Sequence, residues 1–200
     1  MGAQAPLLKN WVTNKAMISY YIEPKVIPNF ITDEEIDCIM KKVVGEMVPS
    51  GVNITGVINN NVRKSKTGFI HHTDTISEKI YSKCAHFLGK PKVDAEGLHI
   101  VHYNVGGFYI PHQDSGDGQS WRINTFIIAL NDDYEGGETE FPNLNLKFKL
   151  KKGDALFFHT QDSNGLVSSN ALHAGLPVKS GEKWICNVWI HKTEIGMSLS

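Results

Sequence analysis

The order of hydrophobic and polar residues differs between the two halves of the chain. From Thr32 to Val48, apolar residues recur three and four positions apart, which places them on one face of an α-helix. Beyond Glu96 this helical pattern disappears, and short apolar or alternating runs are separated by Gly, Asn and Asp. The pattern therefore predicts helices in the first half and a β-rich second half.

Two helices are predicted by the signals at their ends. Residues 32–35 read Thr-Asp-Glu-Glu, a capping box in which a side-chain acceptor is followed three positions later by Glu. Residues 75–78, Thr-Ile-Ser-Glu, repeat this signal, and Gly89-Lys90-Pro91 should end the second helix. The first helix should continue to about Val48 and bury one face, formed by Ile36, Ile39, Met40 and Val43.

Six short runs in the second half predict strands. They are Leu98–Val105, Arg122–Leu130, Leu144–Leu150, Ala155–His159, Leu172–Val178 and Trp184–Ile190. Such a series is typical of a β-sandwich or jelly roll. Residues 136–139, Gly-Gly-Glu-Thr, read as a turn that enters a strand. We expect residues 1–21 to form an N-terminal arm and residues 22–200 a single domain, with its β core at about residues 96–192.

Composition narrows the class of protein. The chain has 200 residues, of which 41% are hydrophobic, enough for one domain with a substantial core. Its formal charge of -1 gives no general attraction to nucleic acid or to anionic membranes. No apolar run approaches the ~20 residues that span a bilayer, so we expect a soluble, cytoplasmic protein, unless a targeting segment was removed before Met1. The odd number of cysteines, Cys38, Cys84 and Cys186, favours reduced, buried thiols over disulfides.

His112-Gln113-Asp114 is the first candidate for chemistry. In an extended strand, residues two apart point to the same side, so His112 and Asp114 can bind one metal ion from a single strand. With a second histidine they would form the 2-His-1-carboxylate set that binds Fe(II) and leaves positions open for substrate and oxygen. His173 and His159 both lie in β-type contexts and both remain candidates for the third ligand.

Other histidines have simpler explanations. His72-Thr73-Asp74 repeats the His-x-Asp spacing, but it immediately precedes the second predicted helix, where Asp74 or Thr75 should cap the helix N-terminus. His99 and His102 are three apart on a predicted strand, so they should point to opposite faces and cannot share an ion. We therefore expect structural roles for these four residues.

Several motifs in the same order resemble the prolyl 4-hydroxylases, a family of Fe(II)- and 2-oxoglutarate-dependent dioxygenases. The similarity covers about residues 98–191, and weaker similarity reaches residues 61–65. The matching stretches are Tyr103–Asp114, Arg122–Thr125, Gly136–Phe141, Lys152–Phe158 and His173–Trp189. The resemblance implies a mainly β (α+β) fold, with a double-stranded β-helix (jelly-roll) core and N-terminal helices packed on one sheet.

The resemblance also implies roles for individual residues. His173, which has Lys183 ten residues later as in the family, becomes the preferred third metal ligand beside His112 and Asp114. Lys183 would bind the distal carboxylate of 2-oxoglutarate, and Tyr103 and Thr125 would help to hold it. Three further residues match positions near the substrate or co-substrate, and they are Tyr109, Arg122 and Trp189.

Tyr109 needs an irregular strand to take part in the site. It lies three residues before His112, on the opposite side of a regular strand, so it can reach the pocket only through a bulge or turn. Gly106-Gly107 supplies backbone freedom nearby. Arg122 can equally be a surface residue, and Trp189 a core residue.

The implied activity is hydroxylation of peptidyl proline at C4. Fe(II) would be the cofactor. 2-Oxoglutarate and O2 would be the co-substrates, consumed with release of succinate and CO2, and ascorbate would serve as reductant. The expected partner is a proline-containing peptide or protein, without nucleic acid or membrane, and the expected assembly is a monomer or weak oligomer. Two alternatives remain, a nucleic-acid demethylase of the same superfamily and a non-catalytic peptide-binding module on the same fold.

Overall fold

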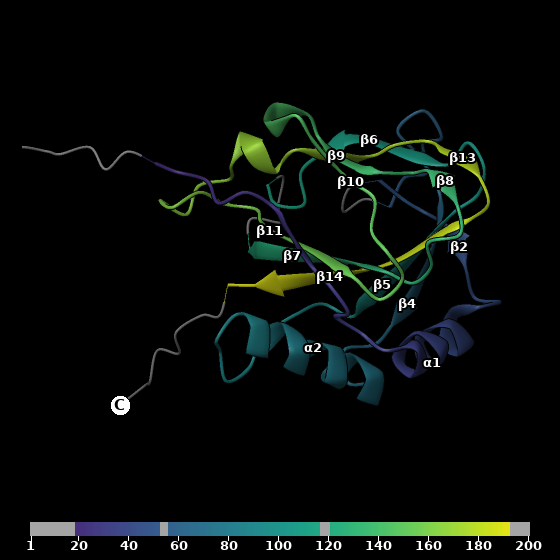
Figure 1. Ribbon diagram of the computed structural model, residues 1–200, viewed down its shortest axis with the longest axis horizontal. Coiled ribbons are helices and arrows are strands. Elements are labelled where there is room, and N and C mark those ends of the chain that lie inside the picture. Colours follow the sequence, from purple (N-terminus) through teal and green to yellow (C-terminus); the bar gives the residue numbers. More distant parts are fainter. Residues whose placement is uncertain (1–18, 53–55, 117–120, 193–200) are drawn as a thin grey trace, which may run out of the picture.

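Two antiparallel sheets face each other in the computed structural model, which describes residues 19–52, 56–116 and 121–192 (Figure 1). The larger sheet has seven strands in the order β1 (Lys25–Ile27), β11 (Ala155–His159), β7 (Arg122–Ala129), β14 (Lys183–His191), β5 (Leu98–Tyr103), β4 (Lys66–Ile70) and β2 (Val48–Pro49). The second sheet has five, in the order β10 (Leu146–Phe148), β9 (Thr139–Phe141), β12 (His173–Gly175), β6 (Phe108–His112) and β3 (Arg63–Lys64). β8 (Glu135–Gly136) and β13 (Val178–Ser180) pair separately. This is the predicted jelly-roll class of fold.

Both helices, α1 (Asp33–Val43) and α2 (Thr75–Phe87), cover the outer face of the larger sheet (Figure 1). Thr32 and Glu35 form the predicted capping box, and Asp74 caps α2 by accepting a hydrogen bond from the Ile76 backbone N–H. The predicted end of the first helix was wrong. α1 stops at Val43, five residues early, because the chain turns at Gly45, whose φ of 104° a helix cannot contain.

Alternation along the strands divides the larger sheet into two faces. Ile100 on β5 and Cys186 on β14 belong to a core beneath the helices. Their neighbours Val101 and Ile185 belong to a second core between the sheets. Because successive side chains of a strand point to opposite faces, every second residue of β5, β7 and β14 is directed toward the second sheet. These positions supply one wall of the candidate site.

The six predicted runs all contain strands, with changed boundaries, and the structure has further strands outside these runs. Ala155–His159 is confirmed in full. The run Leu172–Val178 forms parts of two strands, because the chain leaves β12 after Gly175 and then pairs Val178 in β13 with Gly136. The run Leu144–Leu150 was too long, since a 3-10 helix takes up Pro142–Leu144 before β10 begins. β4 and β6 were not among the predicted runs.

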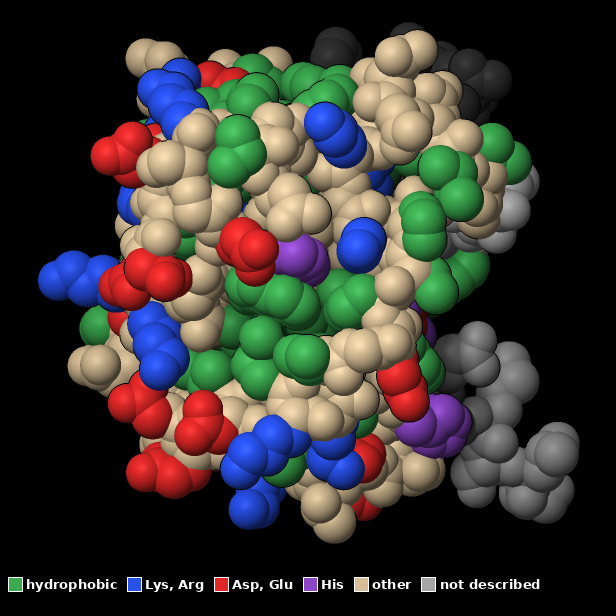
Figure 2. Space-filling model, turned by 90° about the vertical axis from the view of Figure 1, so that its right-hand side faces the viewer, with side chains coloured by type: hydrophobic (Ala, Val, Ile, Leu, Met, Phe, Trp, Pro, Cys, Tyr) green, Lys and Arg blue, Asp and Glu red, His purple; other side chains and the backbone are tan. Residues whose placement is uncertain are grey.

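Three further predictions concern the cysteines, membrane-spanning helices and the N-terminal arm. The three cysteines are free; Cys84 and Cys186 are buried, whereas Cys38 is only half-buried. Among the described residues, no helix is both long and apolar enough to cross a bilayer. Figure 2 shows one face of the molecule, on which a band of hydrophobic side chains crosses the middle while charged side chains gather below it. The predicted arm, residues 1–21, lies outside the described residues up to position 18.

Candidate active site

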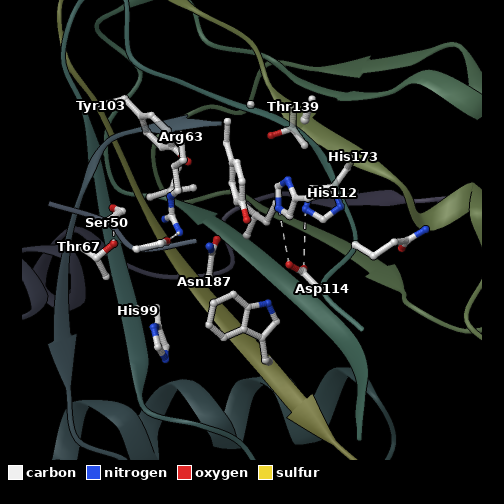
Figure 3. A pocket seen from close by; sticks show the side chains of 18 of the residues that line it. Ser50, Arg63, Thr67, His99, Tyr103, His112, Asp114, Thr139, His173 and Asn187 are labelled. Carbon is white, nitrogen blue, oxygen red and sulfur yellow. Dashed lines mark hydrogen bonds and ion pairs between the residues drawn. The ribbon is translucent and has the colours of Figure 1, made fainter. Parts of the chain in front are cut away.

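Two histidines and one aspartate meet between the sheets (Figure 3). His112 ends β6 and His173 begins β12, and the two are directly paired across these strands. Nε2 of His112 lies 3.8 Å from Oδ1 of Asp114, and Nε2 of His173 lies 3.8 Å from its Oδ2. One donor atom from each residue lies within 4.8 Å of the others. Three ligand atoms at these separations can bind one shared metal ion.

The two imidazoles are oriented by the backbone. Nδ1 of His112 is 2.9 Å from the carbonyl oxygen of Ile110, and Nδ1 of His173 is 3.0 Å from that of Ala171. A carbonyl can only accept, so each Nδ1 donates a hydrogen to the backbone, and each Nε2 is directed toward Asp114. Burial lowers the pKa of His112 to about 3, which favours the neutral form that binds metals.

Asp114 does not lie on the strand that the sequence predicted for it. β6 ends at His112, and Asp114 follows in a bend, buried and within reach of the larger sheet. Its Oδ2 accepts a hydrogen bond from the Thr125 hydroxyl at 2.8 Å. Burial would raise the pKa of the Asp114 carboxyl, but His173, His112 and the Thr125 hydrogen bond together hold it below its ordinary value. The carboxylate therefore remains ionised.

Thr125 has a different contact from the one expected. Its hydroxyl, predicted to hold the co-substrate carboxylate, is fully buried and bonded to Asp114. Thr139, at the start of β9, lines the cavity instead. The sequence predicts only that Thr139 ends a turn. Strand register brings it to the site, because β9 pairs Thr139 with Gly175 of β12, two residues after His173.

Lys183 is a buried cation without a carboxylate partner. It is 4% exposed at the start of β14, and its Nζ donates a hydrogen bond to the Gly137 carbonyl at 2.6 Å. The ring of Tyr103 lies 5.4 Å from the same Nζ. Among the described residues, no carboxylate oxygen forms an ion pair with Lys183, and burial lowers its pKa to about 8. Such a group favours an anionic ligand.

One cavity of about 720 Å³ is lined by all of these side chains except that of Thr125. The second sheet contributes His112, His173 and Thr139, while the larger sheet contributes Tyr103 and Lys183. In Figure 3, Tyr103 and Thr139 lie on the side away from Asp114. The cavity therefore has one part lined by the candidate metal ligands and another part lined by Lys183, Tyr103 and Thr139.

Tyr109 reaches the cavity through the bulge that its spacing required. β12 pairs His173 with His112 and Gly175 with Tyr109. Two residues along β12 therefore lie opposite three residues along β6, which is a β-bulge. The bulge lies in β6 itself and not at Gly106-Gly107. The Tyr109 ring stacks on His112 at 3.5 Å between centroids, and the Arg63 guanidinium lies 4.8 Å from its centre.

Arg122 and Trp189 form a stacked pair at the edge of the cavity. The Arg122 Cζ lies 3.8 Å from the Trp189 ring centre, and Arg122 binds both oxygens of Glu96 at 2.5 and 2.7 Å. Arg122 is thus a buried residue rather than a surface one. The indole nitrogen of Trp189 is buried and has no hydrogen-bond partner among the described residues.

The rival histidines lie elsewhere. Nδ1 of His159 is 2.8 Å from the Asn124 side-chain amide, and its ring packs on Phe157, away from the candidate metal ligands. His99 faces the cavity, whereas His102 stacks on Trp184 on the opposite face of the sheet, as their spacing predicted. His112, Asp114 and His173 form the one group in the described part of the chain with metal-ligand spacing.

Several cavity residues were not singled out from the sequence, among them three polar ones. Arg63 of β3, Asn187 of β14 and Thr139 all line the cavity (Figure 3). Asn187 has a detectable signal, because it follows Lys183 at an even spacing on one strand and must share its face. Arg63 belongs to the segment with weaker family similarity, but its strand is only two residues long and could not be predicted.

Comparison with known proteins agrees with this geometry. Residues 98–191 match the model of the 2OG-Fe(II) oxygenase superfamily. A protein of Acanthamoeba polyphaga mimivirus named as a candidate prolyl 4-hydroxylase is 35% identical over 86% of this chain and 75% of its own length. Prolyl 4-hydroxylase 5 of Arabidopsis thaliana is 31% identical over 93% of this chain and 73% of its length. The chain belongs to the prolyl 4-hydroxylase family. It is thus a 2-oxoglutarate-dependent dioxygenase of the class that hydroxylates proline.

A solved structure supports the same conclusion. The viral collagen prolyl hydroxylase of Paramecium bursaria Chlorella virus-1, in complex with 2-oxoglutarate, is 31% identical and has a TM-score of 0.69 over 84% of this chain and 94% of that one. The prolyl hydroxylase of Trichoplax adhaerens with a peptide fragment of hypoxia inducible factor has a TM-score of 0.64 at 19% identity, which shows the fold alone. The predicted family, fold class and enzyme class are confirmed.

Proposed function

We propose that His112, Asp114 and His173 hold the Fe(II) of a peptidyl-proline 4-hydroxylase. The observation that carries this proposal is the meeting of two imidazoles and one carboxylate, with one possible ligand atom from each within 4.8 Å of the others. Two nitrogens and one oxygen on the same side of an ion are the donor set of Fe(II) oxygenases. Bound there, the iron would supply the oxidising chemistry, in which O2 and 2-oxoglutarate yield succinate, CO2 and a hydroxylated carbon.

The protein's own residues would bind the co-substrate. Lys183 would donate a charge-assisted hydrogen bond to the distal carboxylate of 2-oxoglutarate. Tyr103 and Thr139, which line the same part of the cavity, would add hydroxyl hydrogen bonds. The opposite end of the co-substrate would then extend toward His112 and Asp114.

The substrate would be a peptide that enters over the larger sheet. Tyr109 is held against His112, and Arg122 fixes the Trp189 ring beside Asp114, so two aromatic faces border the reacting position. The polyproline II conformation is extended and already ordered, so a proline-rich peptide loses little entropy on entering an open groove. Hydroxylation at C4 and the use of ascorbate as reductant rest on the family relationship.

The test is mass spectrometry of proline-containing peptides incubated with the protein, Fe(II), 2-oxoglutarate and ascorbate. We expect one added oxygen atom on a peptidyl proline, located at C4, with equal release of succinate and no reaction of free proline. An Asp114→Ala variant of equal thermal stability is the matched control and should give neither product. Succinate release that depends on a methylated oligonucleotide, with all peptides unchanged, would favour the nucleic-acid demethylase. Binding of peptide without any succinate release would favour the non-catalytic module.

A further inference from the structure

We propose that Phe69 and His99 form a subsite for a second proline ring, three residues from the proline that is hydroxylated. This inference rests on the proposed function, because it concerns the peptide of that same reaction. It assigns a role in substrate selection to two residues that lie outside the metal-binding and co-substrate-binding parts of the cavity.

Phe69 and His99 are paired across adjacent strands. Phe69 of β4 lies opposite His99 of β5, and His99 lies opposite Asn187 of β14. All three side chains are directed toward the second sheet, since Ile70 and Ile100 at neighbouring positions belong to the core beneath the helices. A row of side chains therefore crosses the floor of the cavity from its open edge toward its centre.

The aromatic rings of this row are in contact. The Phe69 and His99 centroids are 5.1 Å apart at 74°, and His99 and Trp189 are 4.5 Å apart at 60°. In Figure 3, Asn187 lies between His99 and Asp114. The aromatic surface thus continues from Trp189, beside the candidate metal site, to Phe69 at the mouth of the same cavity.

Phe69 is exposed in a position that packing does not explain. Its side chain is 52% exposed, although it lies beside a large apolar core. The ring lies directly against the backbone of Gly97, where an added Cβ would stand 2.2 Å from the Phe69 Cζ. The absence of a side chain at Gly97 therefore lets the ring lie low on the cavity floor, with one face free.

The distance from the reaction centre selects the residue that this subsite can reach. Thr125, which holds Asp114, is on β7, and β7, β14 and β5 are consecutive strands. Strands are spaced about 4.8 Å apart, so His99 on β5 lies roughly 10 Å across the sheet from β7, and the Phe69 ring on β4 lies beyond it, 5.1 Å from the His99 ring. Polyproline II rises about 3.1 Å per residue with three residues per turn. A residue three positions from the target proline would thus be about 9 Å away and would point to the same side.

The chemistry of the subsite matches a proline ring. Phe69 offers an apolar ring face and His99 a planar imidazole; Nε2 of His99 lies 3.6 Å from Oε2 of Glu96, and the two carboxylate oxygens of Glu96 lie 2.5 and 2.7 Å from Arg122. Aromatic-lined grooves are the usual receptors of polyproline II segments.

The experiment compares two peptides of equal length, one with a single proline and one with prolines three residues apart, separated by two alanines. For each we would measure KM and kcat by succinate release, and locate the hydroxyl group by tandem mass spectrometry. The parent protein should show a lower KM for the spaced pair. Phe69→Ala should raise that KM about 3- to 10-fold, the effect of one aromatic contact. The KM for the single-proline peptide and for 2-oxoglutarate should not change.

Two controls separate this subsite from general damage. Phe69→Tyr keeps the ring and should keep the preference for the spaced pair, and Tyr20→Ala removes a 64% exposed aromatic residue outside the cavity lining and should have no effect. Equal KM values for the two peptides in the parent protein, or an equal change for both in Phe69→Ala, would overturn the inference while the proposed function stands. If the parent protein hydroxylates neither peptide, the proposed function itself fails.

Discussion

Thr125 donates its hydroxyl hydrogen to Oδ2 of Asp114 at 2.8 Å, and this bond joins the centre of the larger sheet to the candidate metal site. Thr125 is fully buried in β7, so its own position is fixed by packing. Asp114 lies just beyond β6, where the strand no longer fixes the side chain. The bond therefore sets the orientation of the carboxylate, leaving Oδ1 facing His112.

We expect Thr125→Val to weaken metal binding about 10- to 100-fold, the usual effect of removing a residue that orients a metal ligand. Isothermal titration with Co(II) or with anaerobic Fe(II) measures this. Thr125→Ser keeps the hydroxyl group and should retain the parent affinity. If Thr125→Val bound the metal normally but lost affinity for 2-oxoglutarate, the hydroxyl would contact the co-substrate, as the sequence first suggested.

The three candidate ligands should be individually essential. His112→Ala, Asp114→Ala and His173→Ala each remove one of three donors from a shared site, so each should abolish succinate release while the far-ultraviolet circular dichroism remains that of the parent. His159→Ala, at a histidine bonded to Asn124, should retain turnover. Loss of activity in His159→Ala together with full activity in His173→Ala would reverse the assignment of the third ligand.

Much of this site could be predicted because its residues lie on regular strands. Lys183 and Trp189 are both on β14, an even number of residues apart, so alternation alone places them on one face. The cap of α1 was also predictable, since a capping box is a local signal that involves only a few consecutive residues. The capping box predicted at residues 75–78 was wrong, because Asp74 is the N-cap of α2 and Thr75 already lies in the helix.

The rest depends on pairing between distant strands. Nothing local to Thr125 shows that its hydroxyl would meet Asp114, because that contact requires the two sheets to face each other. The same holds for Phe69, whose role follows from its register with His99 and from the missing side chain at Gly97. The end of α1 was missed for a different reason: the residues after Gly45 remain partly apolar, and periodicity alone cannot detect a backbone turn.

Lys183→Ala should weaken 2-oxoglutarate binding. A hydrogen bond to a charged group contributes roughly 1.5–3 kcal/mol, so the apparent affinity should fall about 10- to 150-fold. Succinate release measured against 2-oxoglutarate concentration tests this. Lys179→Ala, at an exposed lysine of the neighbouring strand β13, should leave the titration unchanged. An unchanged titration in Lys183→Ala would assign the anion site to another residue.

Glu96→Gln should disturb peptide binding without affecting the co-substrate. Burial would raise the pKa of the Glu96 carboxyl, but hydrogen bonds from His99 and Arg122 hold it well below its ordinary value. The ionised form thus stabilises the fold at neutral pH, and this contribution is lost as the pH falls below about 4.5.

The amide of Glu96→Gln cannot replace the paired charge, so Arg122 should loosen from Trp189. We expect a lower melting temperature and a raised KM for peptide, with the KM for 2-oxoglutarate unchanged. Glu23→Gln, at an exposed residue before β1, is the control and should leave all three values unchanged. A normal peptide KM in Glu96→Gln would show that Trp189 holds its position without Arg122.

The affinity for 2-oxoglutarate should decline at alkaline pH because of Lys183. Burial lowers the pKa of this amine from 10.5 to about 8 in the free protein. Below that pH the ammonium group is present and attracts a carboxylate; above it the charge is lost, so the KM for 2-oxoglutarate should rise as the pH increases from about 8 to 9.5.

The free energy of unfolding should change with pH in the opposite direction to the affinity for 2-oxoglutarate. The unfolded chain keeps its proton up to the ordinary pKa, so between the two values the unfolded state binds more protons and the stability of the free protein rises with pH. Lys183→Arg separates the effect of Lys183 on the KM for 2-oxoglutarate from other alkaline changes. A guanidinium stays charged throughout this pH range, so the variant should give a KM nearly independent of pH. An equal rise of KM in both proteins would place the titrating group elsewhere.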